Sequence, residues 1–213
     1  YVTLVWGLCV AIALPVSYYL AFCIKRESIR VLLFLLCTIP FWTSNIIRMI
    51  SWIPLLGREG LVNQALLNLN LVQQPVEWLL YSDFAIVLGM VHLYNFFMIA
   101  PVFNSMMRID RTLITAARDM GASGFEVLKE IILPLTAPGM AIGSIFVVTL
   151  TMGEYVTVRL MGGGQEASIG KLISTQIGSL QYPLAAANAV ILLLFTLVMV
   201  TGILRVVDIQ KEL

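Results

Sequence analysis

Residues 115–134 read TAARDMGASGFEVLKEIILP, a stretch in which small and charged residues interrupt an otherwise apolar chain. Its first six residues predict the end of a short helix, and Gly121 suits a left-handed C-terminal cap because a residue without Cβ tolerates positive φ. Ser123 and Glu126 have the spacing of a capping box, in which each side chain accepts a backbone N–H at a helix start. Pro134 is expected to end that second helix. The stretch therefore predicts two short helices joined by a tight turn.

The composition of the whole chain is that of a membrane protein. Of its 213 residues, 60% are hydrophobic and 12% are charged, and the mean hydropathy is +0.94. Such a chain has too few polar side chains to cover a soluble globule. The net charge of +1 and the absence of a basic run give no sign of nucleic-acid binding. The three cysteines show no metal-ligand spacing, so no metal site is expected.

Five segments approach the roughly 20 apolar residues that a helix needs to cross the hydrocarbon core of a bilayer. They are approximately Tyr1 to Ile24, Val31 to Ile53, Phe84 to Met107, Gly139 to Leu160 and Leu184 to Val207. The expected fold is all-α, a polytopic bundle of membrane-spanning helices that forms one domain over residues 1–213. In this bundle, residues 108–138 form a loop between the third and the fourth span.

Lysine and arginine are distributed unevenly between the two sides of these spans. Nine of them lie on one side, namely Lys25, Arg26, Arg30, Arg108, Arg111, Arg118, Lys129, Arg205 and Lys211. Three lie on the other side, at positions 58, 159 and 171, and Arg48 lies inside a span. By the positive-inside rule the first side is cytoplasmic. The loop 108–138 is therefore expected to face the cytoplasm.

This cytoplasmic loop resembles that of the permease subunits of ATP-binding-cassette importers, which carries EAA, three residues, Gly, nine residues, and then Ile-x-Leu-Pro. Ala116, Ala117, Gly121, Ile131, Leu133 and Pro134 fall in register, and Thr115 stands where the family usually has Glu. The resemblance implies a coupling helix that sits in a cleft of the ATPase subunit. The expected coupling residues are Thr115, Ala116, Ala117, Asp119, Gly121, Ala122, Ser123 and Glu126. An apolar face for that partner is expected from Leu113, Ile114, Met120, Phe125 and Leu128.

Two further motifs resemble the spermidine and putrescine branch of these permeases, which also includes transporters of other amines and opines. They are PFWTSNIIR at residues 40–48 and LMGG at residues 160–163, which leads into Ile169 and Gly170. The resemblance implies a subunit of an ATP-driven importer in the bacterial inner membrane, with a polyamine or related amine as the favoured cargo and alternating access as the mechanism. Because such permeases usually have six spans, one more helix is expected before Tyr1.

The same resemblance implies the partners of the chain. They are an ATPase dimer, a second homologous permease, an extracytoplasmic solute-binding protein and the lipid bilayer. ATP and Mg would be used by the ATPase, and no cofactor is expected on this chain. The P-loop pattern fails around Gly170, because Lys171 is followed by Leu172 rather than by Ser or Thr.

Polar residues inside the predicted spans are the candidates for a cargo path, since a charge at mid-bilayer costs about 2.5–3.5 kcal/mol and normally faces a partner or water. Glu154 could hold an ammonium group beside Tyr155, which would add a cation–π contact, or it could pair with Arg159 or Arg48. Arg48 also keeps open an opine, an amino acid or another organic anion as cargo. The remaining candidates are Trp42, Asn45, Tyr94 and Asn95, which could instead be interfacial anchors or packing residues.

Two other classes of protein compete with the importer. An intramembrane enzyme is not expected, because the chain has no HExxH motif and no paired intramembrane aspartates. An ion-driven secondary transporter is the stronger alternative, since spans broken at Pro40 and Pro101 could build a midplane site. That alternative leaves the loop at residues 115–134 unexplained.

Overall fold

The computed structural model describes residues 1–164 and 168–206. Two predictions lie outside the described residues: Val207 as the end of the last span, and Lys211 as one of the cytoplasmic cations. Within these ranges every regular element is a helix and there is no strand. The helices are α1 Val2–Tyr18, η1 Tyr19–Cys23, α2 Glu27–Thr38, η2 Ile39–Trp42, α3 Asn45–Leu56, α4 Leu61–Asn68, η3 Glu77–Leu79, α5 Asp83–Met107, α6 Arg111–Asp119, α7 Gly124–Val127, η4 Leu128–Ile132, α8 Leu133–Met152, α9 Val156–Met161, α10 Ile169–Gly178 and α11 Tyr182–Val206. The all-helical prediction is thus confirmed for the part of the chain that is described.

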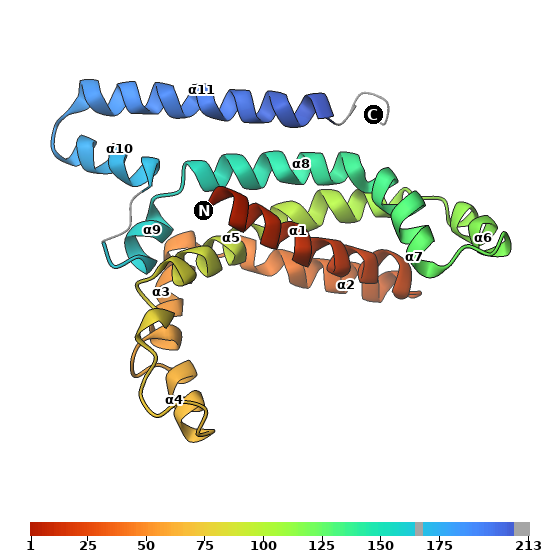
Figure 1. The fold of residues 1–213 in the computed structure, drawn as a ribbon, viewed down its shortest axis with the longest axis horizontal. Coiled ribbons are helices and arrows are strands. Elements are labelled where there is room, and N and C mark those ends of the chain that lie inside the picture. The colour runs from red at the N-terminus through yellow and green to blue at the C-terminus, as the bar shows by residue number, and fades with distance from the viewer. Residues whose placement is uncertain (165–167, 207–213) are drawn as a thin grey trace.

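The packed centre of the bundle consists of α1, α5 and α8 (Figure 1). Gly139 and Gly143 lie four residues apart on α8, and both face α5. A Cβ at Gly143 would lie 2.6 Å from the sulfur of Met98, and one at Gly139 would lie 2.5 Å from the carbonyl oxygen of Pro101. Small residues at this spacing let two membrane helices approach closely. The two helices therefore pack almost backbone to backbone.

Among the described residues, four helical segments are long and apolar enough to cross a membrane, namely Val2–Cys23, Glu77–Met107, Gly124–Met152 and Tyr182–Arg205. The predicted span from Val31 to Ile53 differs from these, because it bends by 93° between Trp42 and Asn45. The chain is extended at residues 43 and 44, and Pro40 just before them has no backbone N–H to continue a helix. The described part of the chain therefore contains four candidate spans, or five if the bent pair is one span.

The helix that begins at Gly124 does not end at Pro134, and that prediction is wrong. The segment continues as far as Met152. Its second part, η4, is a π-helical turn, in which hydrogen bonds run from i to i+5 and the register changes. Pro134 then occupies the first turn of α8, where a residue without an N–H is tolerated.

The predicted span from Gly139 to Leu160 also ends early, at Met152. Residues 153–155 are not helical, and α9 begins after them at Val156. Gly153 follows the last helical residue, and glycine is unfavourable inside a helix because it loses more conformational freedom than other residues, which suits a break at this position. Glu154 therefore lies in the break between α8 and α9, and not within a continuous helix as expected.

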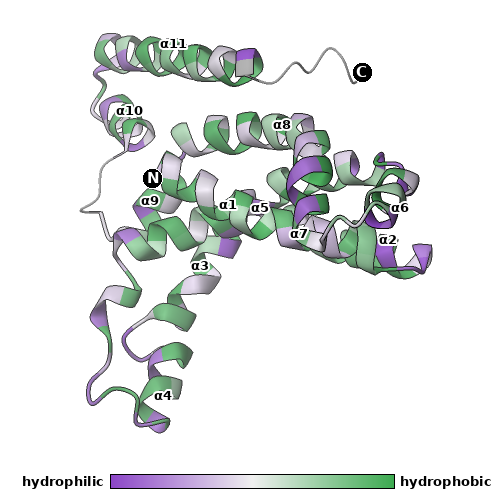
Figure 2. Cartoon of the chain, turned by 45° about the vertical axis from the view of Figure 1, so that its right-hand side comes forward, coloured by the Kyte–Doolittle hydropathy of each residue, from purple (hydrophilic) through white to green (hydrophobic). Residues whose placement is uncertain are grey.

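Polar and apolar residues separate along the bundle. Figure 2 shows hydrophobic residues along α8 and α11, and hydrophilic residues gathered on α6, α7 and the nearby end of α2. The α6–α7 pair lies at one end of the bundle, and the arm formed by α3 and α4 lies toward the other end (Figure 1). The basic residues of the turn before α2 and of α6 thus share one end.

Candidate functional site

The turn between α6 and α7 has the cap predicted at Gly121. This residue has φ of +91°, and its N–H donates to the carbonyl of Arg118 at 2.9 Å. The N–H of Ala122 donates to the carbonyl of Ala117 at 3.0 Å. This pair of bonds is a Schellman motif, which satisfies the last carbonyls of α6. The C-terminal end of α6 is therefore closed by its own backbone.

The start of α7 has the predicted capping box. The backbone N–H of Ser123 donates to Oε2 of Glu126 at 2.7 Å, and the N–H of Glu126 donates to Oγ of Ser123 at 3.3 Å. At the other end of the pair, Oδ1 of Asp110 accepts the N–H of Thr112 at 2.9 Å. This bond holds the pKa of the Asp110 carboxyl below its usual value. Local hydrogen bonds thus fix both helix starts.

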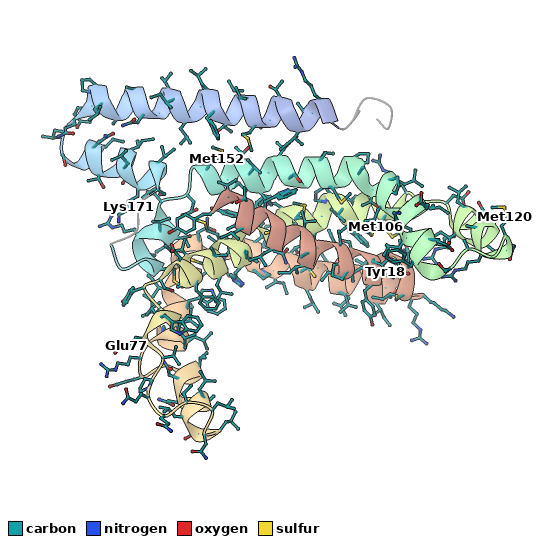
Figure 3. The ribbon with its side chains drawn as sticks, in the orientation of Figure 1. Tyr18, Glu77, Met106, Met120, Met152 and Lys171 are labelled. Atoms are coloured by element: carbon teal, nitrogen blue, oxygen red, sulfur yellow. The ribbon has the colours of Figure 1, made fainter. Side chains whose placement is uncertain are left out.

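Three apolar side chains project from the α6–α7 pair into the surroundings. Met120 is 84% exposed and Phe125 is 72% exposed, and Leu113 is 49% exposed. Met120 lies at the tip of α6, away from the bundle (Figure 3). Ile114 and Leu128, the other two members of the expected face, pack against the core. Only part of that face is therefore open to a partner.

The eight expected coupling residues gather around this turn. Ala117 is buried and Ala122 is half-buried, while the six exposed ones are Thr115, Ala116, Asp119, Gly121, Ser123 and Glu126. The hydroxyl of Thr115, which stands where the family usually has Glu, donates to the carbonyl of Arg111 at 3.0 Å. The hydroxyl proton of Thr115 is therefore used in a hydrogen bond within α6.

A contact that the sequence did not reveal joins α6 to the end of the first span. Nη2 of Arg111 donates to the carbonyl of Ala21 at 2.9 Å. Ala21 belongs to η1, a second π-helical turn. The bond connects residues 90 positions apart, so no local pattern could have predicted it.

A second group of polar side chains lies between α3, α5 and α9. The Tyr94 hydroxyl, near the middle of α5, donates to Oε2 of Glu154, and the Thr157 N–H donates to the other carboxylate oxygen at 2.9 Å. The Ser168 hydroxyl donates to the Glu154 carbonyl at 3.0 Å. Residue 154 therefore ties α5, α9 and the start of α10 together.

Arg48 belongs to the same neighbourhood but does not pair with Glu154. Its Nη2 donates to Oδ1 of Asn45 at 2.8 Å and to the carbonyl of Thr43 at 3.1 Å. Its helix α3 packs against α9 and α5. Within the described ranges the two ion pairs are Arg58–Glu77 at 3.7 Å and Lys129–Glu130 at 3.5 Å. The pairing of Glu154 with Arg48 or Arg159 is thus not formed.

Some buried polar atoms in this region have no hydrogen-bond partner among the described residues. They are Nε of Arg48, Oδ1 of Asn95 and Oγ1 of Thr157. A buried polar atom without a partner costs about 1–3 kcal/mol. Because these atoms are buried within the chain, a polar solute could reach them only if the surrounding helices moved.

The remaining path candidates are more exposed. Trp42 is 82% exposed, with its ring 6.4 Å from that of Phe41, and Tyr155 is 42% exposed. The structure thus brings Glu154, Tyr94, Asn45 and Arg48 to one region and leaves Trp42 on the surface.

Sequence reasoning missed Thr157 and Gly89. A Cβ at Gly89 would lie 2.9 Å from Cγ2 of Thr157 and 3.0 Å from Sδ of Met49. This glycine lets α3 and α9 approach α5 one turn from Tyr94. Its place inside the long apolar helix α5 is the signal that could have revealed the contact. In the part of the chain described, no group of three His, Cys, Asp or Glu could hold a metal ion.

The chain is similar in sequence to several permease proteins. The spermidine/putrescine transport system permease protein PotB of Salmonella typhimurium strain SL1344 is 32% identical over 200 residues, which cover 93% of this chain and 67% of that protein. PotB of Escherichia coli strain K12 is 32% identical over 200 residues, covering 93% and 70%. The inner membrane ABC transporter permease protein YdcU of the same strain is 28% identical over 187 residues, covering 83% and 59%.

The chain also matches the model of a protein family. Residues 10–210 match the family described as the binding-protein-dependent transport system inner membrane component. This finding agrees with the apolar helices, and it does not support an ion-driven secondary transporter. The chain therefore belongs to this family, as a multi-pass inner-membrane permease subunit of an ATP-binding-cassette importer.

Proposed function

We propose that this permease carries a polyamine or a related organic cation into the cytoplasm. The relatives that are named for spermidine and putrescine transport cover 93% of the chain, and this coverage supports the same class of cargo. The observation that carries the proposal is the environment of Glu154. Its carboxylate is held by a hydroxyl and a backbone N–H and forms no ion pair within the described ranges.

An acidic group in this setting favours a cationic solute. Hydrogen bonds from neutral donors stabilise the ionised carboxylate without cancelling its charge. An ammonium group that approaches Glu154 would therefore meet an uncompensated negative charge and free lone pairs. Arg48 likewise donates to neutral acceptors, Oδ1 of Asn45 and the carbonyl of Thr43, so an organic anion is the alternative cargo that the uptake test must separate from a cation.

The energy for transport would come from a partner ATPase dimer that binds ATP and Mg. We infer that α6 and α7 enter a cleft of that ATPase, because Met120 and Phe125 expose apolar surface at the end of the bundle. Closure of the ATPase would move the α6–α7 pair, and the spans would alternate between inward-open and outward-open states. A second permease subunit and an extracytoplasmic binding protein would complete the importer.

The proposal is tested by uptake into proteoliposomes that contain the complete importer. Uptake of labelled spermidine or putrescine should require ATP and the binding protein. Replacing Glu154 by Gln exchanges a charge-assisted hydrogen bond for a neutral one, a difference of about 1.4 kcal/mol, so uptake should fall about tenfold. Cargo binding by the soluble protein should not change. Glu77→Gln, which removes an exposed acid from an ion pair with Arg58, is the matched control.

Two results would contradict the proposal. Unchanged uptake by the Glu154→Gln variant would remove this carboxylate from the path. ATP-dependent uptake of an organic anion, with no uptake of amines, would show that the cargo class is wrong.

A further inference from the structure

A cavity of about 200 Å³ lies between the end of the first span and the coupling helices. Tyr18 and Phe22 line it from α1 and η1, and Arg111, Thr115 and Arg118 line it from α6. Its floor is formed by α7 and η4, through residues that include Val127. Figure 3 shows Tyr18 at the end of the bundle that carries α6 and α7.

The two arginines of this cavity share one face of α6. Arg111 and Arg118 are seven positions apart and Thr115 lies between them, a spacing that aligns side chains on one side of a helix. This side turns toward the end of α1, since all three residues line the cavity. Leu113 and Met120, which are exposed, lie outside this lining. The apolar and the basic surfaces of α6 therefore face different surroundings.

The cavity is positively charged. No carboxylate is among the described residues that line it. Within the described ranges Arg118 forms no ion pair and no side-chain hydrogen bond, and Arg111 is bonded only to the carbonyl of Ala21. Of the acids nearby in the sequence, Asp110 and Glu126 cap helix starts with their carboxylates, and Asp119, next to Arg118, is not among the lining residues and forms no ion pair within the described ranges. A planar guanidinium presents donors in a fork that matches the oxygens of a phosphate.

The level of the cavity in the membrane decides which phosphate would reach it. The chain leaves η1 at Cys23 and passes at once through Lys25 and Arg26, which marks the cytoplasmic surface. Aromatic residues such as Tyr18 are typical of that boundary. The cytoplasmic leaflet contains anionic lipids, and basic pockets on that side bind their headgroups.

We propose that this cavity binds the headgroup phosphate of an anionic phospholipid from the cytoplasmic leaflet, with Arg118 and Arg111 as its ligands. The bound lipid contacts α6 and the end of α1 at once, and it thereby strengthens the connection between the coupling helices and the first span. The inference rests on the importer function of the family and not on the identity of the cargo.

The first experiment measures how much lipid remains bound to the complete importer. Native mass spectrometry would count phosphatidylglycerol retained after purification from mixed phosphatidylcholine and phosphatidylglycerol vesicles. A basic residue near such a headgroup is worth a factor of about five in affinity, so Arg118→Gln should lower retention about fivefold. Because Arg118 has no bond to the rest of the chain within the described ranges, this variant should fold. Lys129→Gln, which removes an exposed cation that pairs with Glu130, should retain lipid normally.

The second experiment measures ATP-driven uptake in proteoliposomes. Phosphatidylglycerol added to phosphatidylcholine should raise uptake per ATP in the unmodified importer and in Lys129→Gln, but not in Arg118→Gln. Equal retention and equal stimulation in both variants would overturn the proposal. If inorganic phosphate in phosphatidylcholine vesicles produces the same stimulation, the ligand is a soluble anion and the lipid assignment is overturned.

A third result would point to a protein partner. If Arg118→Gln releases the ATPase subunit equally in all lipids, the arginine meets an acidic group of the ATPase, and the lipid site is refuted. Loss of amine uptake in all variants and all lipids would instead concern the proposed cargo path, so the two proposals can fail separately.

Discussion

Gly121 provides the sharpest test of the proposed coupling role of the turn between α6 and α7, because the effect of replacing it arises from the backbone alone. Its φ is +91°, and a Cβ built at this position would meet no atom of this chain within 4 Å. An L-residue in the left-handed region costs about 1–2 kcal/mol. Asparagine reduces this cost by local hydrogen bonding, and a β-branched residue increases it.

These costs predict an order of effects. We expect Gly121→Asn to be the mildest change, Gly121→Ala to destabilise the turn by about 1 kcal/mol, and Gly121→Val to destabilise it by about 2 kcal/mol or more. The strain would open the two Schellman bonds that close α6. Because α6 then moves independently of α7, ATP hydrolysis should continue while uptake declines in the same order.

The assay compares uptake per hydrolysed ATP in proteoliposomes that contain the complete importer. Gly124→Ala is the matched control. A Cβ at this glycine would also have nothing within 4 Å of it, but the φ of Gly124 is outside the left-handed region. The residue begins α7, where alanine is tolerated better than glycine. This variant should behave like the unmodified protein.

An order that follows side-chain size would refute the backbone argument. If alanine is well tolerated while asparagine and valine are equally harmful, the position is limited by contact with the ATPase and not by φ. A valine variant with normal coupled uptake would refute both explanations, and with them the importance of this turn.

Two further predictions concern packing. Asn63 is fully buried, and its side chain makes three hydrogen bonds at 2.7–3.0 Å with backbone groups on either side of α4. Asn63→Ala should lower the free energy of unfolding by about 2–4 kcal/mol and increase hydrogen exchange in α4. Asn68→Ala, at an exposed position, should have neither effect. Gly143→Leu should overpack the contact of α8 with α5, which should destabilise the fold by about 1–3 kcal/mol and lower the Tm of the importer. Gly7→Leu should leave the Tm unchanged, because Gly7 has open space around it.

The turn between α6 and α7 was predictable because its structure is encoded within a few positions. Gly121 supplies positive φ, and Ser123 and Glu126 cap a helix that starts between them. Each of these effects depends on neighbours in the sequence and on no distant contact. Local hydrogen bonding of this kind can be recognised without knowledge of the fold.

The shapes of the spans were less predictable, because hydropathy measures apolar content and not helical register. The bend after Trp42 and the break at residues 153–155 lie within apolar stretches. Pro134 was predicted to end a helix, but the π-helical turn before it keeps the helix continuous. Such a turn changes the hydrogen-bonding register without a distinctive side-chain pattern.

The partner of Glu154 could not be deduced from spacing either. Charge alone favoured Arg48 or Arg159, but the carboxylate bonds to Tyr94, 60 residues away. The break between α8 and α9 explains the second hydrogen bond of this carboxylate. A continuous helix would have bonded the N–H of Thr157 to its own backbone, whereas the break leaves that N–H free to hold the carboxylate at 2.9 Å. An acid satisfied by neutral donors needs no resident cation, and this is the condition under which a cationic cargo can become its counter-charge.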